Sequence, residues 1–397
     1  MDMVFVYEDK IAQDAAGNYY TGSAFSQEVF DRYLRHFDHI TLLMRKAEID
    51  PSDVETLGKM NRIRSDRIDV VLLPNTTASL RSFLDPGVHA RFRQTVLNEL
   101  KPDRAVILRA PSRSGAIAAD YCRAHGRPYL AEAVGCPWDS LWNHSLKGKA
   151  LAPGMWAELR RTMRHADYAV YVTSEFLQRR YPTNGKAAAI SDVELQPMDD
   201  GILEKRLEKI QNHAGKIKIG TAGALHVAYK GQRYMIEALA KLKARSRTDF
   251  EYHLAGGGDS APLLQLAEQL GVADQLVLDG VLRHDRMFAW FDELDLYIQP
   301  SIVEAMPRAL IEAMSRGLPA FGSIVGGIPE LLGEDCVFPR KDVDAIAAGL
   351  AALSEDRMLS MAERNFSHAK QFQKEILEKK RFAFYSAFAA EAKEKQG

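Results

Sequence analysis

Two glutamates and one lysine in the second half of the chain are the residues best placed to do chemistry. Glu304 and Glu312 are separated by seven residues, and Lys230 precedes a glycine in an earlier loop. Glu304 lies on the loop after an expected strand, Leu296–Gln299, and Glu312 lies about one turn into the next helix. A lysine can neutralise a phosphate, and a carboxylate can accept hydrogen bonds from two neighbouring hydroxyl groups.

The backbone between the two glutamates adds an anion-binding element. Pro307 is expected at the first helical position, and Gly317 at the end of the helix. The backbone N–H groups near Arg308 and Ala309 are then free at a helix N-terminus, where they and the helix dipole suit a diphosphate. The alternative for Glu312 is that it only complements the helix dipole.

The order of motifs in this half resembles that of a known enzyme family. Besides the two glutamates, the region from Ile217 to Leu332 contains a Lys-Gly pair, an AGGGD turn, a QLVLDG stretch, an LDLYIQPS strand and a GGIPE segment. This series resembles the retaining GT-B glycosyltransferases of family 4, the glycosyl transferases group 1. The resemblance implies an α/β protein with two doubly wound Rossmann-like domains that face each other across a cleft.

The resemblance also implies a role for each matching residue. Lys230 is expected to bind the diphosphate of a nucleotide-sugar donor, Glu312 its ribose, and Glu304 the hydroxyls and developing positive charge of the transferred sugar. These roles fit the chemistry, because breaking the anomeric C–O bond builds oxocarbenium character while the diphosphate leaves as an anion. Gly223, after the first strand of this half, is also expected at the donor.

One position departs from the family pattern. Many members have an arginine directly after the glycine that matches Gly223, and this chain has Ala224 there. Either Lys230 then acts with backbone dipoles alone, or Arg233 or His226 supplies the second cation.

The first half of the chain offers two further candidates. Gly22 and Ser23, in YYTGSAFSQEVF, resemble the family's glycine-rich turn before a helix, which lets a phosphate or an acceptor approach the backbone; the alternative is an ordinary turn. The insertion Glu8–Tyr20 before this turn is longer than usual for the family. Arg109 follows the strand Ala105–Leu108 and is expected to face the cleft.

A later loop of this half combines aromatic and polar side chains. The stretch GCPWDSLWNHS follows PYLAEA, and three of its residues are candidates for contact with the acceptor or sugar: Trp138, Asp139 and His144. A tryptophan can stack on a sugar ring, and an aspartate can bind hydroxyl groups. The alternative is that the tryptophan is a packing residue.

Short apolar runs alternate with helical periodicity along the chain, which indicates parallel sheets joined by helices. A turn cluster and a charged stretch over Asp192–Gly215 break this alternation and are expected to link two domains. The expected division is an acceptor-side Rossmann-like domain over residues 1–200, a nucleotide-sugar-binding one over 201–375, and a helix over 376–397 that crosses back to the first domain.

Composition narrows the range of partners. A formal net charge of -1 argues against a nucleic-acid partner. The three cysteines have no metal-ligand spacing, and the one Asp-x-Asp pair, Asp342 and Asp344, opens a helix that it is expected to cap. We therefore expect no metal, and no cofactor besides the donor substrate.

The sequence also carries signals about location. Its start lacks the basic and apolar regions of a signal peptide, and no run of about 18 apolar residues occurs, so a cytoplasmic protein is expected. Arg160, Arg161 and Arg164 give one expected helix a basic face. That face fits either peripheral contact with anionic lipid on the cytosolic side of a membrane or a solvated surface.

The resemblance predicts a retaining hexosyltransferase. It is expected to move a hexose-type sugar from a nucleoside-diphosphate sugar to a hydroxyl of a glycan or lipid-linked acceptor, in cell-surface polysaccharide biosynthesis. A UDP-sugar is favoured as donor, with GDP-mannose as the second candidate. The alternatives are a nucleotide-sugar epimerase of the same fold and a non-catalytic GT-B partner subunit. The base, the sugar, the linkage and the acceptor leave no signature in the sequence.

Overall fold

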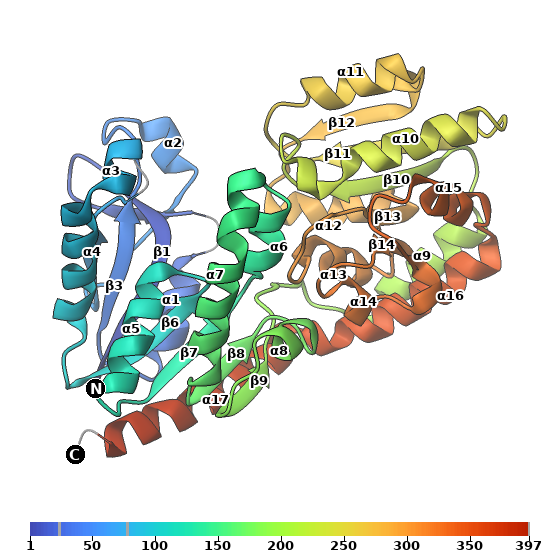
Figure 1. Ribbon diagram of the computed structural model, residues 1–397. Coiled ribbons are helices and arrows are strands. Elements are labelled where there is room, and N and C mark those ends of the chain that lie inside the picture. The colour runs from blue at the N-terminus through green and yellow to red at the C-terminus, as the bar shows by residue number, and fades with distance from the viewer. Residues whose placement is uncertain (23–24, 77–78, 396–397) are drawn as a thin grey trace.

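The computed structural model of the protein describes residues 1–22, 25–76 and 79–395, which form two α/β domains (Figure 1). Each domain has its own sheet with helices packed against it, parallel throughout in the second domain and parallel except for β2 and β4 in the first. The expectation of two doubly wound domains is confirmed.

The strands of the first domain are β1 (Asp2–Gln13), β2 (Tyr19–Thr21), β3 (Ile40–Lys46), β4 (Asn61–Arg62), β5 (Ile68–Leu73), β6 (Arg104–Ala110), β7 (Tyr129–Ala133), β8 (Tyr168–Tyr171) and β9 (Lys186–Ala189). Its helices are α1 (Gln27–Leu34), α2 (Val54–Gly58), α3 (Leu80–Leu84), α4 (Pro86–Glu99), α5 (Arg113–Ala124), α6 (Pro137–Trp142), α7 (Leu146–Arg164) and α8 (Phe176–Arg180).

The strands of the second domain are β10 (Ile217–Ala222), β11 (Phe250–Ala255), β12 (Leu276–Gly280), β13 (Leu296–Gln299), β14 (Ala320–Ser323) and β15 (Val337–Phe338). Its α-helices are α9 (Asp200–Gln211), α10 (Gln232–Lys243), α11 (Ala261–Gln269), α12 (His284–Glu293), α13 (Arg308–Met314), α14 (Ile328–Leu331), α15 (Val343–Ala351) and α16 (Glu355–Ala369). Four 3₁₀ turns, η1 (Ala228–Lys230), η2 (Ala273–Gln275), η3 (Glu334–Cys336) and η4 (Lys370–Phe372), and the last helix, α17 (Lys374–Glu394), complete the chain.

The parallel strands of the two sheets follow the same order, and the first sheet has one further strand, β9, at its edge. The parallel strands of the first sheet run β5-β3-β1-β6-β7-β8-β9, and those of the second run β12-β11-β10-β13-β14-β15. In each sheet the order reverses beside the first strand, between β1 and β6 and between β10 and β13. Ligands of doubly wound sheets bind at this switch point, at the carboxyl ends of the strands. Lys230 and Glu304 follow strands that flank a switch point, and Arg109 lies near the carboxyl end of β6, which flanks the other.

The sheets are buried on both faces, which explains the apolar runs in the sequence. All five residues of β7 are buried, as are the first five of β3. A strand covered by helices on both sides has no solvent face and therefore loses the alternation of polar and apolar residues.

The insertion that the sequence places before Gly22 is a β-hairpin. β1 continues past the expected strand to Gln13, and β2 returns antiparallel to it, with Ile11 opposite Thr21. β4 then pairs antiparallel with β2 and extends the edge of the sheet. The insertion therefore enlarges the first sheet.

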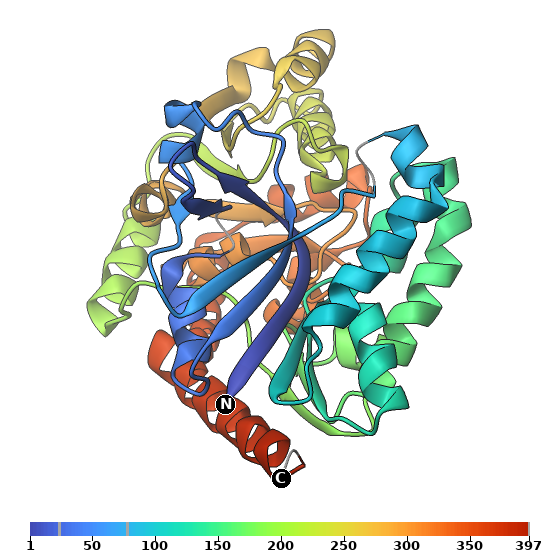
Figure 2. The ribbon, with the colours of Figure 1, turned by 90° about the vertical axis from the view of Figure 1, so that its left-hand side faces the viewer.

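Two segments connect the domains. Residues 190–199 lead from β9 to α9, and α9 packs on the second domain, where Arg206 donates hydrogen bonds to the carbonyls of Phe291 (2.8 Å) and Leu294 (2.6 Å). The expected linker over Asp192–Gly215 thus contains a helix of the second domain. After η4 the chain returns as α17, which lies along the first domain beside the N-terminus (Figures 1 and 2).

Candidate functional site

A cleft of about 800 Å³ lies between the domains, and residues of both domains and of α17 line it. The second domain contributes Gly223, Lys230, His284, Gln299, Glu304, Arg308, Ala309 and Glu312, among others. The first domain contributes Arg32, Tyr33, Arg109, Glu132, Asp192 and Glu194, and α17 contributes Arg381 and Tyr385. The residues that the motifs singled out in the second half of the chain therefore meet at one place.

The carboxylate of Glu304 is the centre of the second-domain side. Its Oε1 accepts hydrogen bonds from Lys230 Nζ at 2.6 Å, Ser301 Oγ at 3.0 Å and Gln299 Nε2 at 3.2 Å. Tyr297 continues the network by donating its hydroxyl to Gln299 Oε1 at 2.9 Å. Within the described residues, the side-chain hydrogen bonds of Glu304 all end on Oε1, and none involves Oε2. Sequence reasoning missed Gln299 and Ser301, although both stand in the LDLYIQPS strand that leads to Glu304.

The Lys-Gly pair has a steric reason. Gly231 has a φ of +79°, and a Cβ there would lie 1.9 Å from the carbonyl oxygen of Pro300. The N–H of Ile302 donates to the carbonyl of Tyr229 at 2.7 Å, so this loop is docked on the end of β13. Only glycine allows both the left-handed backbone and the close approach, which together bring Lys230 to Glu304.

The GGIPE segment supports the same loop from the other side. Gly326 has a φ of +58°, and a Cβ there would lie 2.1 Å from the carbonyl oxygen of Glu304. The next residue, Gly327, donates its N–H to the carbonyl of Ala305 at 2.6 Å. At the end of the segment, Glu330 accepts from the N–H groups of Ser174 (2.6 Å) and Phe176 (2.5 Å) in the first domain. The motif thus fixes the Glu304 loop and links the two domains.

Glu312 lies in α13 with its side chain only 12% exposed, and its nearest ion partner is His284. His284 Nε2 lies 3.6 Å from Glu312 Oε1, and this carboxylate raises the pKa of His284 above its usual value. The helix boundaries differ from the expectation: Pro307 is the N-cap, so α13 begins at Arg308, and it ends at Met314. Its seven residues end before Gly317, whose φ of +60° closes the following turn.

The two residues expected to substitute for the family's second cation, Arg233 and His226, lie away from the cleft. Arg233 pairs with Glu237 along α10, and neither Arg233 nor His226 lines the cleft. Arg308 does line it, and within the described residues its guanidinium has no hydrogen bond or ion pair. Among the described residues, the lysine and arginine side chains that line the cleft from the second domain are therefore Lys230 and Arg308.

The first-domain side is a buried network of charges. Arg109 donates to Glu132 Oε2 at 3.0 Å and forms a short contact with Asp192. Tyr33 and Tyr385 donate their hydroxyls to Glu132 Oε1, at 2.7 and 2.5 Å. Burial, and next the charge of Glu132, raise the pKa of both tyrosines well above the usual value, so they remain protonated donors. Arg109 lies at the cleft as expected, but two carboxylates engage its guanidinium.

Three candidates of the first half lie away from the cleft lining. Trp138 stacks on Trp142, with ring centroids 5.0 Å apart, and Asp139 accepts from Arg180 at 2.5 Å. His144 follows α6 and is exposed. None of the three side chains lines the cleft, so their expected contact with an acceptor or sugar stays a prediction.

The glycine-rich turn of the first domain is described only in part. Gly22 lies at the end of β2, where its carbonyl accepts from Asn61 Nδ2 at 3.0 Å, and Ser23 lies outside the described residues. Gly22 itself does not line the cleft, whereas its neighbours Asn61 and Ser26 do.

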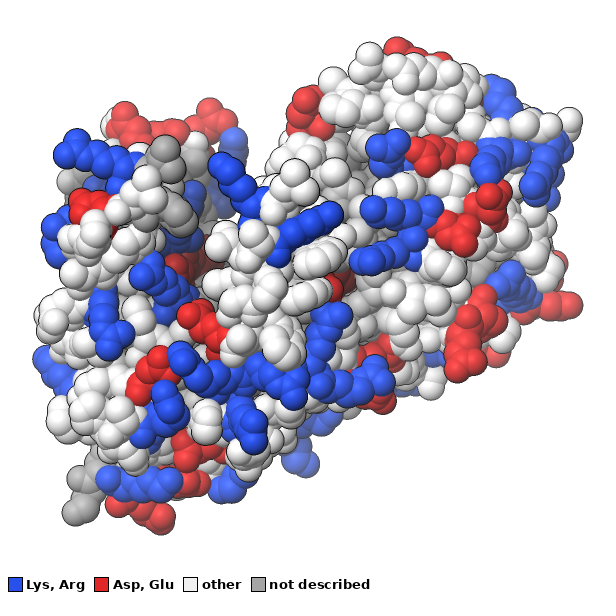
Figure 3. Space-filling view, in the orientation of Figure 1, with Lys and Arg blue, Asp and Glu red and all other residues white. Residues whose placement is uncertain are grey.

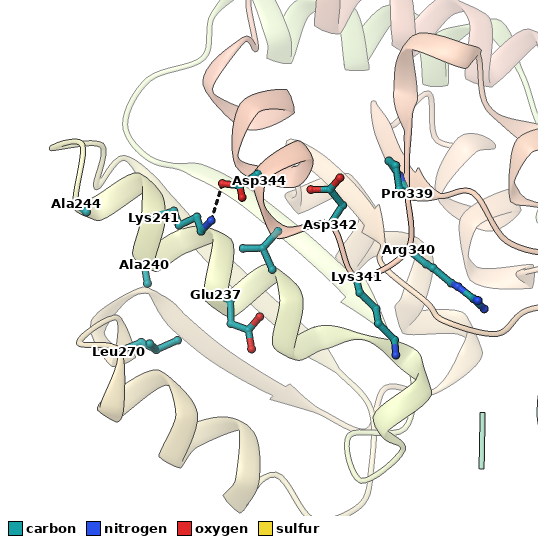
Figure 4. Close-up of a pocket in the computed structure, with 11 residues that line it drawn as sticks. Glu237, Ala240, Lys241, Ala244, Leu270, Pro339, Arg340, Lys341, Asp342 and Asp344 are labelled. Atoms are coloured by element: carbon teal, nitrogen blue, oxygen red, sulfur yellow. Dashed lines mark hydrogen bonds and ion pairs between the residues drawn. The ribbon is translucent and has the colours of Figure 1, made fainter. Parts of the chain in front are cut away.

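The Asp-x-Asp pair lies in a separate surface groove of the second domain, between α10 and the start of α15 (Figure 4). Asp342 caps α15 by accepting from the N–H of Ala345 at 2.9 Å, and Asp344 pairs with Lys241 at 2.5 Å. Both carboxylates are thus occupied, outside the cleft. In the described parts of the chain, no group of three or more His, Cys, Asp or Glu side chains is arranged to hold a metal ion.

Basic side chains gather on the face of the first domain formed by α7 and α8 (Figure 3). Arg160 lies over the ring of Trp156, and Arg161 pairs with Asp120 at 2.7 Å. No helix in the described ranges has the length and apolar character needed to cross a bilayer.

Comparison with known proteins agrees with this geometry. Residues 216–356 match the model of the family Glycosyl transferases group 1. Protein CapJ of Staphylococcus aureus is 29% identical over 347 residues, which are 86% of this chain and 84% of CapJ. The putative colanic acid biosynthesis glycosyltransferase WcaL of Salmonella typhimurium is 34% identical over 135 residues, which are 32% of this chain and 33% of WcaL.

A solved structure extends the similarity to the whole fold. HepE of Anabaena, determined in complex with UDP, aligns over 98% of this chain and all of its own, with a TM-score of 0.59 and 16% sequence identity. The two facing doubly wound domains define the class as GT-B. Residues 216–356 are similar to the group 1 glycosyltransferases, and the comparisons together support a glycosyltransferase.

Proposed function

We propose that the protein is a retaining hexosyltransferase that uses a nucleoside-diphosphate sugar and needs no metal ion. The observation that carries this proposal is the meeting of Lys230, Glu304 and Glu312 at the switch point of the second sheet, inside the interdomain cleft. A cation and two carboxylates at this spacing match the three parts of such a donor: diphosphate, sugar and ribose.

Each part of the donor has a partner in this arrangement. Lys230 and Arg308 bind the diphosphate together with the backbone N–H groups near Ala309, and Gly223 leaves room beside the lysine. Glu312 accepts the ribose hydroxyls. Glu304 stands at the transferred sugar, where its Oε2 accepts sugar hydroxyls and its charge stabilises the oxocarbenium-like carbon. Lys230 donates a hydrogen bond to Glu304, so the donor's phosphate would draw the lysine partly away from this carboxylate.

In the reaction, the bond from the sugar's C1 to the donor phosphate is replaced by a bond from C1 to the acceptor oxygen. The C1–O bond to the diphosphate breaks, and its electron pair stays on the departing phosphate oxygen. The acceptor's hydroxyl oxygen bonds to C1 from the same face, and its proton passes to that phosphate oxygen. Retention follows from this same-face attack, and the proton needs no separate base. Lys230 and Arg308 offset the charge that grows on the leaving group.

The donor and acceptor are proposed from similarity. HepE, which shares the fold, was determined with UDP, and this favours a UDP-sugar over GDP-mannose. WcaL is named for colanic acid biosynthesis, which favours a glycan or lipid-linked acceptor in cell-surface polysaccharide assembly. An acceptor of this kind would be met in the cytoplasm, and the basic face of α7 and α8 suits peripheral contact with the cytosolic side of an anionic membrane.

Two measurements test the proposal in sequence. A thermal-shift panel of UDP, GDP and their sugars identifies the donor, because a ligand of the native state raises the unfolding temperature. Product analysis with that donor then uses lipid-linked sugars and glycans as acceptors, and NMR reads the anomeric configuration of the product. A new glycosidic bond with the donor's configuration is expected. An altered sugar nucleotide released without acceptor would mean an epimerase, and no turnover with any tested pair would favour a non-catalytic subunit.

A further inference from the structure

His284 is a cleft residue to which the roles above assign nothing. It is the first residue of α12, directly after the loop that leaves β12, and its side chain is 58% exposed toward the cleft. Phe288, one turn later on α12, meets the imidazole edge-on, with ring centroids 5.3 Å apart and planes at 88°. The ring is thus held in place while its Nε2 lies 3.6 Å from Glu312 Oε1.

Glu312 needs such a partner. Its carboxylate is nearly buried, and among the described residues His284 is the only side chain that pairs with it. A buried carboxylate without a partner is costly, and a ligand that brings a negatively charged diphosphate nearby increases the cost. Because the contact with His284 uses Oε1, Oε2 remains for hydroxyl groups.

The charges that face His284 come from three elements. Glu312 and Arg308 face it from α13, and Glu194 faces it from the segment that leads out of the first domain. On its own helix, Asp285 is paired with Arg283 at 3.3 Å. The contact with Glu312 has the largest effect and raises the pKa of His284, burial and Arg308 lower it, and Glu194 raises it; the result lies above the usual value of 6.5.

We propose that His284 is a positioning residue for the donor's ribose, which acts through Glu312. Its imidazolium holds Oε1 so that Oε2 faces the ribose hydroxyls, and its positive charge reduces the repulsion between the Glu312 carboxylate and the donor diphosphate. This inference rests on the proposed function, in which Glu312 binds ribose.

The positive charge of His284 depends on pH. The imidazolium is present at low pH and is lost as the pH rises through the raised pKa of His284. Donor affinity should therefore fall as the pH rises above neutral. A nucleotide sugar is a suitable probe, because its diphosphate has no proton to lose near neutral pH, whereas a free nucleoside diphosphate does.

The experiment is calorimetric titration of UDP-glucose and GDP-mannose between about pH 6 and about pH 8.5, where histidine changes charge. Four proteins are compared: the wild type, His284→Gln, His284→Lys and His165→Gln. His165 is an exposed histidine after α7 and serves as the matched control. Over this range the wild type and the control should lose affinity by about five- to tenfold, the difference between a charged and a neutral hydrogen bond.

His284→Gln should bind with one affinity across the range, near the wild-type value at high pH, and His284→Lys should restore the tighter binding without pH dependence. Turnover at saturating donor should change little, because Glu312 acts on binding. A wild-type pH profile in His284→Gln, or no profile in the wild type, overturns the inference and leaves the proposed function standing. A wild type that binds neither nucleotide sugar overturns both.

Discussion

The two sides of the cleft hold their charges in different ways. On the second-domain side, Lys230 shares one oxygen of Glu304 and is 23% exposed, and Arg308 has no partner among the described residues. On the first-domain side, Arg109 lies between two carboxylates, with its side chain 11% exposed. The second domain thus presents charges that a ligand can take over, whereas the charges of the first domain already compensate one another.

This difference in exposure and pairing indicates that the second-domain side of the cleft binds ligands and that the first-domain side stabilises the fold. Replacing the ion partner of a charged side chain costs little free energy where the side chain keeps contact with solvent. It costs much where the replacement would leave a buried charge without a partner. Burial would raise the pKa of Asp192, but Arg109 and Arg381 hold it below the usual value, so this carboxylate stays ionised. The network joins the first sheet to α17 through Tyr385. We therefore assign chemistry to the second-domain side and stability to the first-domain network.

The largest effect should come from breaking the network. Arg109→Ala removes the cation that pairs with both Glu132 and Asp192, and should lower the free energy of unfolding by about 3–5 kcal/mol in urea denaturation. Arg161→Ala, which breaks an exposed pair with Asp120, is the control and should cost at most about 1 kcal/mol. If stability were unchanged and the KM for the acceptor were raised, Arg109 would be a substrate-binding residue. The first-domain side of the cleft would then also bind ligand, contrary to the assignment above.

Substitutions on the second-domain side of the cleft should reduce turnover without reducing stability. Lys230→Ala should reduce kcat at saturating donor by about 10²–10³-fold, because the lysine answers charge that grows as the C1–O bond breaks. Unfolding should change far less than in Arg109→Ala. Lys241→Ala, whose ion pair with Asp344 lies outside the cleft, should keep the wild-type rate. A near-normal kcat in Lys230→Ala would remove the lysine from the leaving-group site.

The same contrast explains what the sequence could predict. Lys230 and Glu304 depend on glycines that close backbone approaches require, Gly231 and Gly326, and Glu312 follows Glu304 at a fixed spacing, so their pattern is visible in the chain itself. The partners of Arg109 lie 23 and 83 residues away, and Tyr385 reaches Glu132 over 253 residues. No local pattern encodes such pairs, because they form only when the sheet and α17 assemble.

Alternating apolar runs predicted both parallel sheets, but not the direction of single side chains in loops. Asp139 follows a strand end, as a site residue would, yet it pairs with Arg180 on α8. His284 was missed for the opposite reason. It stands in no motif, and only the packing of α12 beside α13 brings it to Glu312.

An intermediate effect is expected for the ribose partner. Glu312→Ala should weaken binding of the donor nucleotide by about 1–3 kcal/mol, the range for a charge-assisted hydrogen bond, as read by isothermal titration calorimetry. Glu237→Ala, which removes a partner of Arg233 on the outer side of α10, is the control. Equal affinities in wild type and Glu312→Ala would mean that Glu312 of α13 does not contact the ribose. Of the charged residues proposed to bind the donor on the second-domain side, Lys230 and Glu304 would then remain.

The smallest expected effect is that of metal removal. If Lys230 and Arg308 supply the positive charge for the diphosphate, the rate in excess EDTA should equal the rate without it. The carboxylates near the diphosphate are already paired, Glu304 with Lys230 and Glu312 with His284, so a divalent cation would have to displace one of these cations. Assays in EDTA, and in EDTA with excess manganese or magnesium, make the comparison. A rate abolished by the chelator and restored by either ion would show that the protein's own charges do not stabilise the leaving group without a metal. The second-domain side of the cleft would then have to bind a metal ion as well.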